Sequence, residues 1–188
     1  MTPLDRLDQL PTGTWTMDPA HTTVRAAVRK LLIVDAPASL ELVEGSIRVD
    51  DDGQVAEIVA VLDAASYESG NVQRDAWATG PACLDAERHP HLTFRSRDVR
   101  IDADRSVAIG TVAVRGVDHP IMIEVSDARV QGDTAAVRAD LVLDRQAVGL
   151  GSYPSVLIAR RIPISISVTA RLANAAKPSE ERSVSSVA

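Results

Sequence analysis

Four histidines are the residues of this chain best suited to binding a metal ion or exchanging protons. His21 and His119 lie beside turn residues, and His89 and His91 form a His-Pro-His sequence. A structural zinc site needs four nitrogen or sulfur ligands at close spacing, and one cysteine with scattered histidines does not supply them. We therefore expect solvated or capping histidines, and neither a metal nor a cofactor.

The candidate nucleophile and carboxylates also lack a catalytic context. Cys83 is followed by Leu84 and Asp85, and such apolar and acidic neighbours raise the pKa of a thiol, which predicts a buried, unreactive cysteine. Asp18, Asp75 and Asp85 stand at positions typical of turns and helix caps. The sequence therefore predicts a binding protein with no catalytic residues.

Two polar groupings leave alternatives open. Residues 18–23, DPAHTT, place His21 in a proline turn before a long apolar segment, where it either ties the backbone together or offers a polar handle at the mouth of a binding site. Arg74 and Asp75 form either an ion pair or cap, or a second part of such a mouth.

The composition limits the class of partner. The chain has 188 residues, a net charge of −6 and no cluster of basic residues, which argues against nucleic acid. No run approaches the roughly 18 apolar residues that span a bilayer, and the first residues lack the pattern of a signal peptide, so we expect a cytoplasmic protein. Aromatic residues make up only 3%, which predicts an aliphatic binding cavity suited to a flexible hydrocarbon.

The elements that must position such a site follow a period of two, which is the signature of strands with one buried face. Short turns separate these segments, so the sequence predicts an all-β fold, an extended antiparallel barrel of about eight strands. A helical insertion is expected over residues 71–86, broken at Gly80-Pro81. The expected strands cover residues 14–17, 23–33, 39–49, 55–64, 91–101, 106–114, 121–126, 134–143 and 161–172.

Alternate positions of three strands are small or aliphatic, which indicates room for one ligand inside the barrel. The alternative is that the same residues form a filled core, and that the barrel serves protein interaction or dimerisation. A small-molecule enzyme using the His21 corner is the third hypothesis. The predicted ligand contacts are Val24, Ala26, Val28, Ile58, Ala60, Leu62, Ile164, Ile166 and Val168.

Five segments in order resemble the YceI-like domain family. Residues 15–24 are similar to its W-x-[IL]-D-x-x-H-S-x-[VI] opening, and residues 110–120 to G-x-L-x-[IV]-[RH]-G-V-[TD]-x-P. The other matching segments are 66–75, 84–96 and 143–145 with 149–150. The resemblance implies a lipocalin-like barrel over residues 13–172 that binds a polyisoprenoid, an isoprenoid quinone or a related lipid, and it also implies homodimers.

The family resemblance adds Phe94 and Trp77 to the expected ligand contacts. Trp77 stands where the family motif R-D-x-H has histidine. Ala26, Val28 and Lys30 stand at the positions of F-x-V-x-H in the first long strand, where the family usually carries aromatic and histidine residues. These departures concern the ligand rather than the fold. Outside the expected domain, residues 1–12 form a flexible lead and residues 173–188 a disordered tail.

Overall fold

A computed structural model describes residues 10–30, 34–101, 106–150 and 159–173 of the chain. The predicted lead and tail therefore fall largely outside the described residues. The elements, in chain order, are β1 (Gly13–Met17), a 3-10 turn (Pro19–His21), β2 (Thr23–Lys30), β3 (Val34–Val49), β4 (Val55–Glu68), α1 (Val72–Thr79), β5 (His91–Ile101), β6 (Ser106–Val114), β7 (Val117–Gln131), β8 (Thr134–Asp144) and β9 (Arg161–Leu172).

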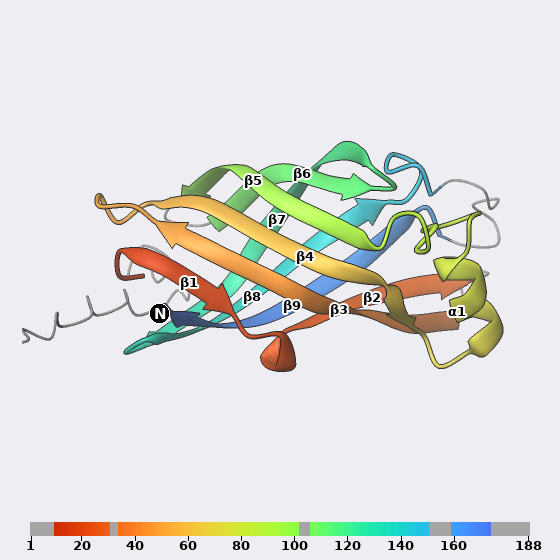
Figure 1. The fold of residues 1–188 in the computed structure, drawn as a ribbon, viewed down its shortest axis with the longest axis horizontal. Coiled ribbons are helices and arrows are strands. Elements are labelled where there is room, and N and C mark those ends of the chain that lie inside the picture. The colour runs from red at the N-terminus through yellow and green to blue at the C-terminus, as the bar shows by residue number, and fades with distance from the viewer. Residues whose placement is uncertain (1–9, 31–33, 102–105, 151–158, 174–188) are drawn as a thin grey trace, which may run out of the picture.

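The strands form one closed, antiparallel barrel (Figure 1). Each strand from β3 to β9 pairs with the next along the chain. β1 and β2 each pair with both β3 and β9, so together they fill one position in the wall. The wall thus has eight positions, which confirms the predicted all-β barrel. Closure also removes the free sheet edges that would otherwise invite aggregation.

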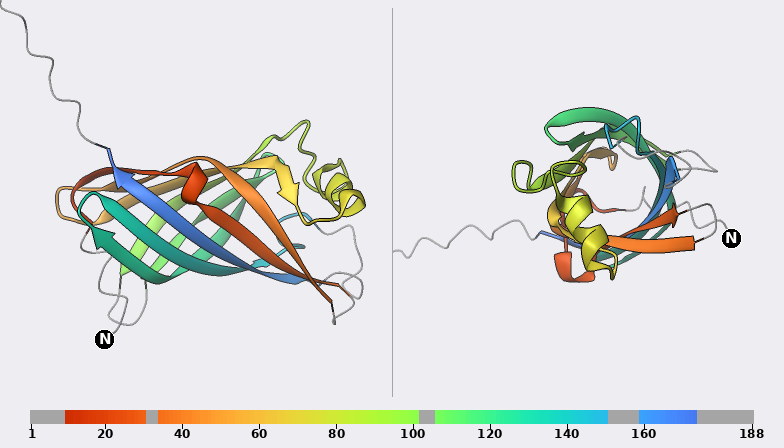
Figure 2. Two further views of the ribbon diagram at one scale, coloured as in Figure 1. Left: turned by 90° about the horizontal axis from the view of Figure 1, so that it is seen from below. Right: turned by 90° about the vertical axis from the view of Figure 1, so that its right-hand side faces the viewer.

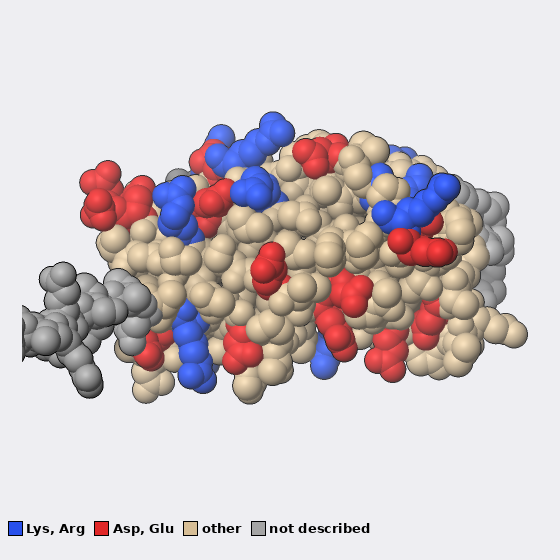
Figure 3. Space-filling view, viewed as in Figure 1, with Lys and Arg blue, Asp and Glu red and all other residues tan. Residues whose placement is uncertain are grey.

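Residues that alternate in the sequence of a strand lie alternately on the inner and the outer face of the barrel. In β9, Ile164 and Ile166 line the interior, and Ser165 between them faces outward and donates a hydrogen bond to the Asp140 carboxylate at 2.7 Å. Acidic and basic side chains are mixed over the face shown in Figure 3, where no continuous basic stripe is seen.

Opposite ends of the barrel are closed in different ways. Near the end where β1 and the β3–β4 hairpin meet lies Trp15, which has no exposed surface and belongs to a cluster of buried side chains. At the other end, α1 lies against the opening (Figure 2). We call the first cluster the Trp15 plug; it includes Leu10, Trp15, Val49, Val55, Ala135 and Ala170.

Helix α1 confirms the predicted helical insertion in shortened form. The Asn71 side chain accepts a hydrogen bond from the Arg74 backbone N–H at 2.9 Å and begins the helix. The helix ends before Gly80-Pro81, as expected, because proline cannot continue it. Beyond it, the Leu84 N–H bonds to the Ala78 carbonyl at 2.9 Å and holds the following turn against the helix.

The extent of β7 differs from the prediction. The expected loop over residues 115–120 is a two-residue turn, Arg115-Gly116, with φ of 50° and 74°, and Pro120 lies within the strand. The expected connection over residues 127–133 is also wrong, because β7 continues to Gln131. A bulge between Val125 and Asp127 shifts the alternation there, so the period of two could not be followed through it.

We expect Gly110→Ala to lower the free energy of unfolding by about 1–3 kcal/mol, measured by urea denaturation. Gly110 pairs with Ser96 beside a bulge in β5, and an added Cβ would lie 2.8 Å from the Ser96 Cα and would also overlap the Arg95 carbonyl. Thr111→Ala, one position along, is the control and is expected to change stability less. An unchanged urea midpoint for Gly110→Ala would contradict this prediction and would show that β5 can shift to accommodate the added Cβ.

Candidate functional site

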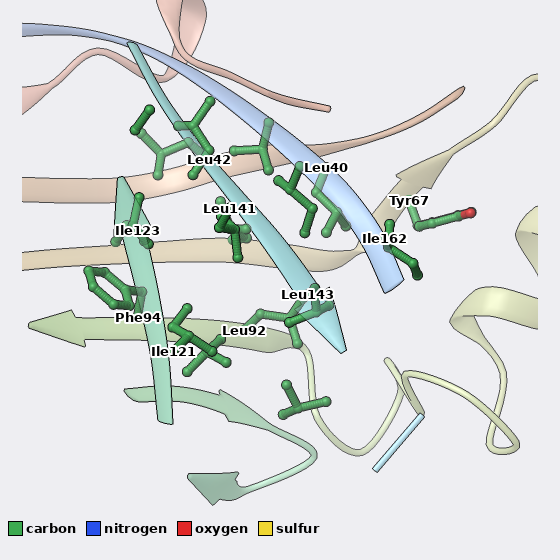
Figure 4. A pocket seen from close by; sticks show the side chains of 18 of the residues that line it. Leu40, Leu42, Tyr67, Leu92, Phe94, Ile121, Ile123, Leu141, Leu143 and Ile162 are labelled. Atoms are coloured by element: carbon green, nitrogen blue, oxygen red, sulfur yellow. The ribbon is translucent and has the colours of Figure 1, made fainter. Parts of the chain in front are cut away.

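A cavity of about 330 Å³ lies inside the barrel. Its walls are almost entirely aliphatic, and Figure 4 shows labelled side chains from β3, β4, β5, β7, β8 and β9 around it. The lining residues are Met17, Thr22, Val24, Val28, Leu40, Leu42, Ile47, Ile58, Ala60, Leu62, Tyr67, Arg74, Trp77, Ala78, Cys83, Leu84, Leu92, Phe94, Ala108, Val112, Val114, Ile121, Ile123, Val125, Val137, Ala139, Leu141, Leu143, Arg145, Leu150, Ile162, Ile164, Ile166 and Val168.

The structure brings together nearly all of the residues expected to contact a ligand. Ala26 is the exception: it lies between Val24 and Val28 in β2, but it is not among the lining residues. The expected contacts that do line the cavity are Val24, Val28, Ile58, Ala60, Leu62, Trp77, Phe94, Ile164, Ile166 and Val168.

His21 is not among the residues that line this cavity. Its ring Nδ1 lies 2.8 Å from Asp18 Oδ2, and its side chain is 66% exposed on the 3-10 turn. Asp18 also accepts a hydrogen bond from the Ala20 N–H at 3.0 Å. The hydrogen bond with His21 is the main cause that holds the pKa of Asp18 below its usual value. The corner therefore stabilises the turn between β1 and β2.

Arg74 lines the cavity, whereas Asp75 does not. The two side chains are linked through Ser69 rather than by a direct ion pair. Arg74 donates from Nε to the Ser69 hydroxyl and from Nη2 to the Ser69 carbonyl, both at 2.6 Å. The Asp75 carboxylate accepts hydrogen bonds from the Ser69 N–H at 3.0 Å and from the Ser69 hydroxyl. Asp75 thereby positions the segment that holds Arg74.

Arg145 is the charged lining residue that the sequence reasoning missed, and most of the other residues it missed are aliphatic. It is only 4% exposed, and it donates from Nε to the Ala159 carbonyl at 3.2 Å and from Nη1 to the Leu150 carbonyl at 3.0 Å. In the sequence, Arg145 stood out only as part of the Asp144-Arg145 match to the family. Because arginines are rarely buried, no other feature of the sequence predicted that this one would line the cavity.

Burial dominates the chemistry of the other titratable lining groups. It raises the pKa of the Cys83 thiol to about 11 and raises the pKa of the Tyr67 hydroxyl. Both groups therefore stay protonated at neutral pH, and a protonated thiol is a poor nucleophile. Across the described ranges, no three histidine, cysteine, aspartate or glutamate side chains gather closely enough to hold a metal ion.

Thr22 carries a polar atom that the cavity leaves without a partner. Its Oγ1 is buried and, within the described part of the chain, makes no hydrogen bond. We expect Thr22→Val to raise the free energy of unfolding by about 1–3 kcal/mol, because an unsatisfied buried hydroxyl costs about that much. Thermal unfolding would measure the change. Thr23→Val, at the exposed neighbouring position, is the control and should change little; a loss of stability in Thr22→Val would contradict the assignment.

None of the helices in the described residues is both long and apolar enough to cross a membrane. Among proteins of known sequence, the chain is similar to a UPF0312 protein of Yersinia pestis (strain Pestoides F), with 29% identity over 82 residues. This match covers 43% of the chain and 43% of the relative, so it spans less than half of that relative's length.

Two solved structures share the fold. BcnA of Burkholderia cenocepacia has a TM-score of 0.72 and 18% identity, over 81% of this chain and 98% of that one. A polyisoprenoid binding domain from Saccharophagus degradans, implicated in plant cell wall breakdown, has a TM-score of 0.65 and 14% identity, over 85% of this chain and 98% of that one. The model of the YceI-like domain matches residues 15–170, and the protein therefore belongs to the YceI-like domain family.

Proposed function

We propose that this protein binds or carries an apolar or amphiphilic lipid, such as a polyisoprenoid or an isoprenoid quinone, in the interior of the barrel. The observation that carries the proposal is the cavity of about 330 Å³ inside the barrel, with its aliphatic walls. Its volume is within the range of small-molecule sites in proteins. Membership of the YceI-like family and the fold shared with a polyisoprenoid binding domain support the same ligand class.

The hydrophobic effect alone can supply a useful affinity here. Burial of each methylene contributes about 0.8 kcal/mol, so a ten-carbon segment contributes roughly 8 kcal/mol before ordering costs. A net free energy of binding of about 8 kcal/mol corresponds to a dissociation constant of about 1 μM, and the ordering costs make the dissociation constant larger than this. Few hydrogen bonds are therefore needed, which agrees with the small number of polar side chains in the wall.

The cavity favours a lipid carrier over the two competing functions. A barrel used only for protein interaction needs no internal space, because aliphatic side chains of this kind would fill it. An enzyme needs a group that exchanges protons, and the described lining residues include no histidine, aspartate or glutamate. The lining thiol and phenol are held protonated by burial, so we propose binding without chemistry.

Native mass spectrometry of the gently purified full-length protein tests this function, followed by organic extraction of whatever is released. We expect either a co-purified lipid of defined mass or uptake of an added isoprenoid quinone by the stripped protein. A bare protein mass, with no uptake of added isoprenoids, would contradict the proposal and favour the interaction module.

Compartment and oligomeric state remain predictions from the sequence. A cytoplasmic location is tested by fractionating cells that produce the native chain, and a homodimer by light scattering after size-exclusion chromatography. A periplasmic or monomeric protein would contradict the respective prediction without affecting the proposed ligand.

A further inference from the structure

Thr22 is a buried polar residue in a cavity wall that is almost entirely aliphatic. It follows the 3-10 turn, lines the cavity and is only 8% exposed. Its backbone N–H bonds to the Pro19 carbonyl at 3.4 Å, but its Oγ1 makes no hydrogen bond within the described residues. The side chain therefore holds a hydrogen-bonding group that the described part of the chain does not use.

Thr22 lies in the part of the cavity that is farther from α1. Thr23, the next residue, pairs with Ser167 of β9, which brings Val168 beside Thr22. From there β2 runs toward α1 (Figure 1), and Val24 lines the cavity along the way. The hydroxyl therefore belongs to the inner part of the binding space.

A ligand can remove the energetic cost of this hydroxyl. A buried hydroxyl without a partner has lost its hydrogen bonds to water and gained none in exchange, so it destabilises the folded protein. A water molecule would be poorly held here, because it needs roughly two to four polar partners and the neighbouring lining residues, Val24 and Val168, are aliphatic. A polar atom of a ligand inside the barrel is the partner that fits.

Rotation about one bond brings the hydroxyl within reach of such a ligand. Oγ1 is covered in this structure, so Thr22 lines the cavity through its carbon atoms. The Cγ2 methyl and Oγ1 are attached to the same Cβ, and staggered χ1 rotamers are about 120° apart. A change of rotamer can therefore move the hydroxyl to the position of the methyl group when a ligand offers it a partner.

We propose that Thr22 determines ligand specificity by forming a hydrogen bond to an oxygen atom of the ligand inside the barrel. The inference rests on the proposed lipid-binding function and narrows its ligand class to isoprenoids that carry a hydroxyl, ether or carbonyl oxygen. The oxygen lies beside Thr22, and the hydrocarbon chain extends from it along the aliphatic wall toward α1. The polar end of the ligand is thus held inside the barrel.

The test compares two ligands that differ by one hydroxyl. Geraniol and 2,6-dimethyl-2,6-octadiene share one isoprenoid chain and are volatile, so the depletion of each from the headspace above lipid-stripped full-length protein gives its affinity. We expect Thr22→Val to weaken geraniol binding about three- to tenfold, the range for one neutral hydrogen bond, and to leave the hydrocarbon affinity unchanged. Thr22→Ser keeps the hydroxyl and is expected to retain most of the geraniol affinity.

Ser106→Ala is the matched control. Ser106 is 1% exposed, and its Oγ likewise has no hydrogen-bond partner among the described residues, but it does not line the cavity. Its removal should leave both affinities unchanged. Because Thr22→Val is expected to be more stable than the unaltered protein, its weaker geraniol binding would not result from a loss of fold.

The possible failures of this test are distinguishable. If Thr22→Val changed the affinities of geraniol and the hydrocarbon equally, or changed neither, the inference would be overturned and lipid binding would stand. An equal loss of geraniol affinity in Ser106→Ala would also overturn it, because the effect would then not require contact with the ligand. Failure of the unaltered protein to bind either ligand would overturn the lipid-binding function itself.

A third ligand gives the direction of the hydrogen bond. The oxygen of geranyl methyl ether accepts a hydrogen bond but does not donate one. Weaker binding of this ether to Thr22→Val, as for geraniol, would show that Thr22 donates to the ligand. A loss confined to geraniol would show that Thr22 accepts from the ligand hydroxyl, and both results support the proposal.

Discussion

Ala60→Trp is expected to abolish lipid uptake while the barrel still folds. Ala60 lines the cavity from β4 and is paired with Gly45 on one side and Phe94 on the other. An indole at this position would project into a space of only about 330 Å³, between the Trp15 plug and α1. A hydrocarbon chain could then no longer lie along the wall, so most of its buried methylene contacts would be lost. Native mass spectrometry with an added isoprenoid measures the uptake.

The matched control for this variant places the same indole outside the barrel. Met122 lies on the outer face of β7 and is 63% exposed, so Met122→Trp is expected to bind as the unaltered protein does. Circular dichroism verifies that both variants retain their strands. Unchanged uptake by a folded Ala60→Trp protein would mean that the interior of the barrel is not the binding site.

The fold could be predicted from the sequence wherever a strand keeps strict alternation. β9 has the predicted bounds of residues 161–172, because Ile162 to Leu172 alternate without interruption. The bounds of β7 could not be predicted. The bulge after Val125 interrupts the alternation of the sequence, and Pro120 within the strand resembles a turn residue. Pairing across the sheet outweighed those local signals, and pairing cannot be read from one strand alone.

The site could be predicted in part for the same reason. Residues of β2, β4 and β9 were recognised by their shared inward face, and the same alternation in β8 would have added Leu141 and Leu143. Arg145 could not be found in this way, since a buried charge depends on carbonyl partners supplied by Leu150 and Ala159. The position of His21 outside the cavity lining could not be predicted, because a proline turn next to a strand does not reveal on which side of the wall it lies.

Trp15→Ala is expected to cause the largest loss of stability of any single change considered, about 3–5 kcal/mol in the free energy of unfolding. Trp15 has no exposed surface, and its backbone pairs with Ile47 of β3 and Leu172 of β9. Its indole Nε1 donates a hydrogen bond to the Pro11 carbonyl at 3.0 Å. Removal of the ring would leave a void in the plug and free that carbonyl. Urea denaturation measures the difference.

Trp77→Ala provides the control, because it removes the same side chain from the other end of the barrel. Trp77 lies on α1, is only half-buried and lines the cavity, so its removal should cost less stability and should instead alter ligand affinity. The two variants then distinguish the roles of the two ends of the barrel: the Trp15 plug stabilises the closed wall, whereas α1 contributes to the binding space. If Trp77→Ala proved the more destabilising variant, the α1 end rather than the plug would be what holds the barrel closed.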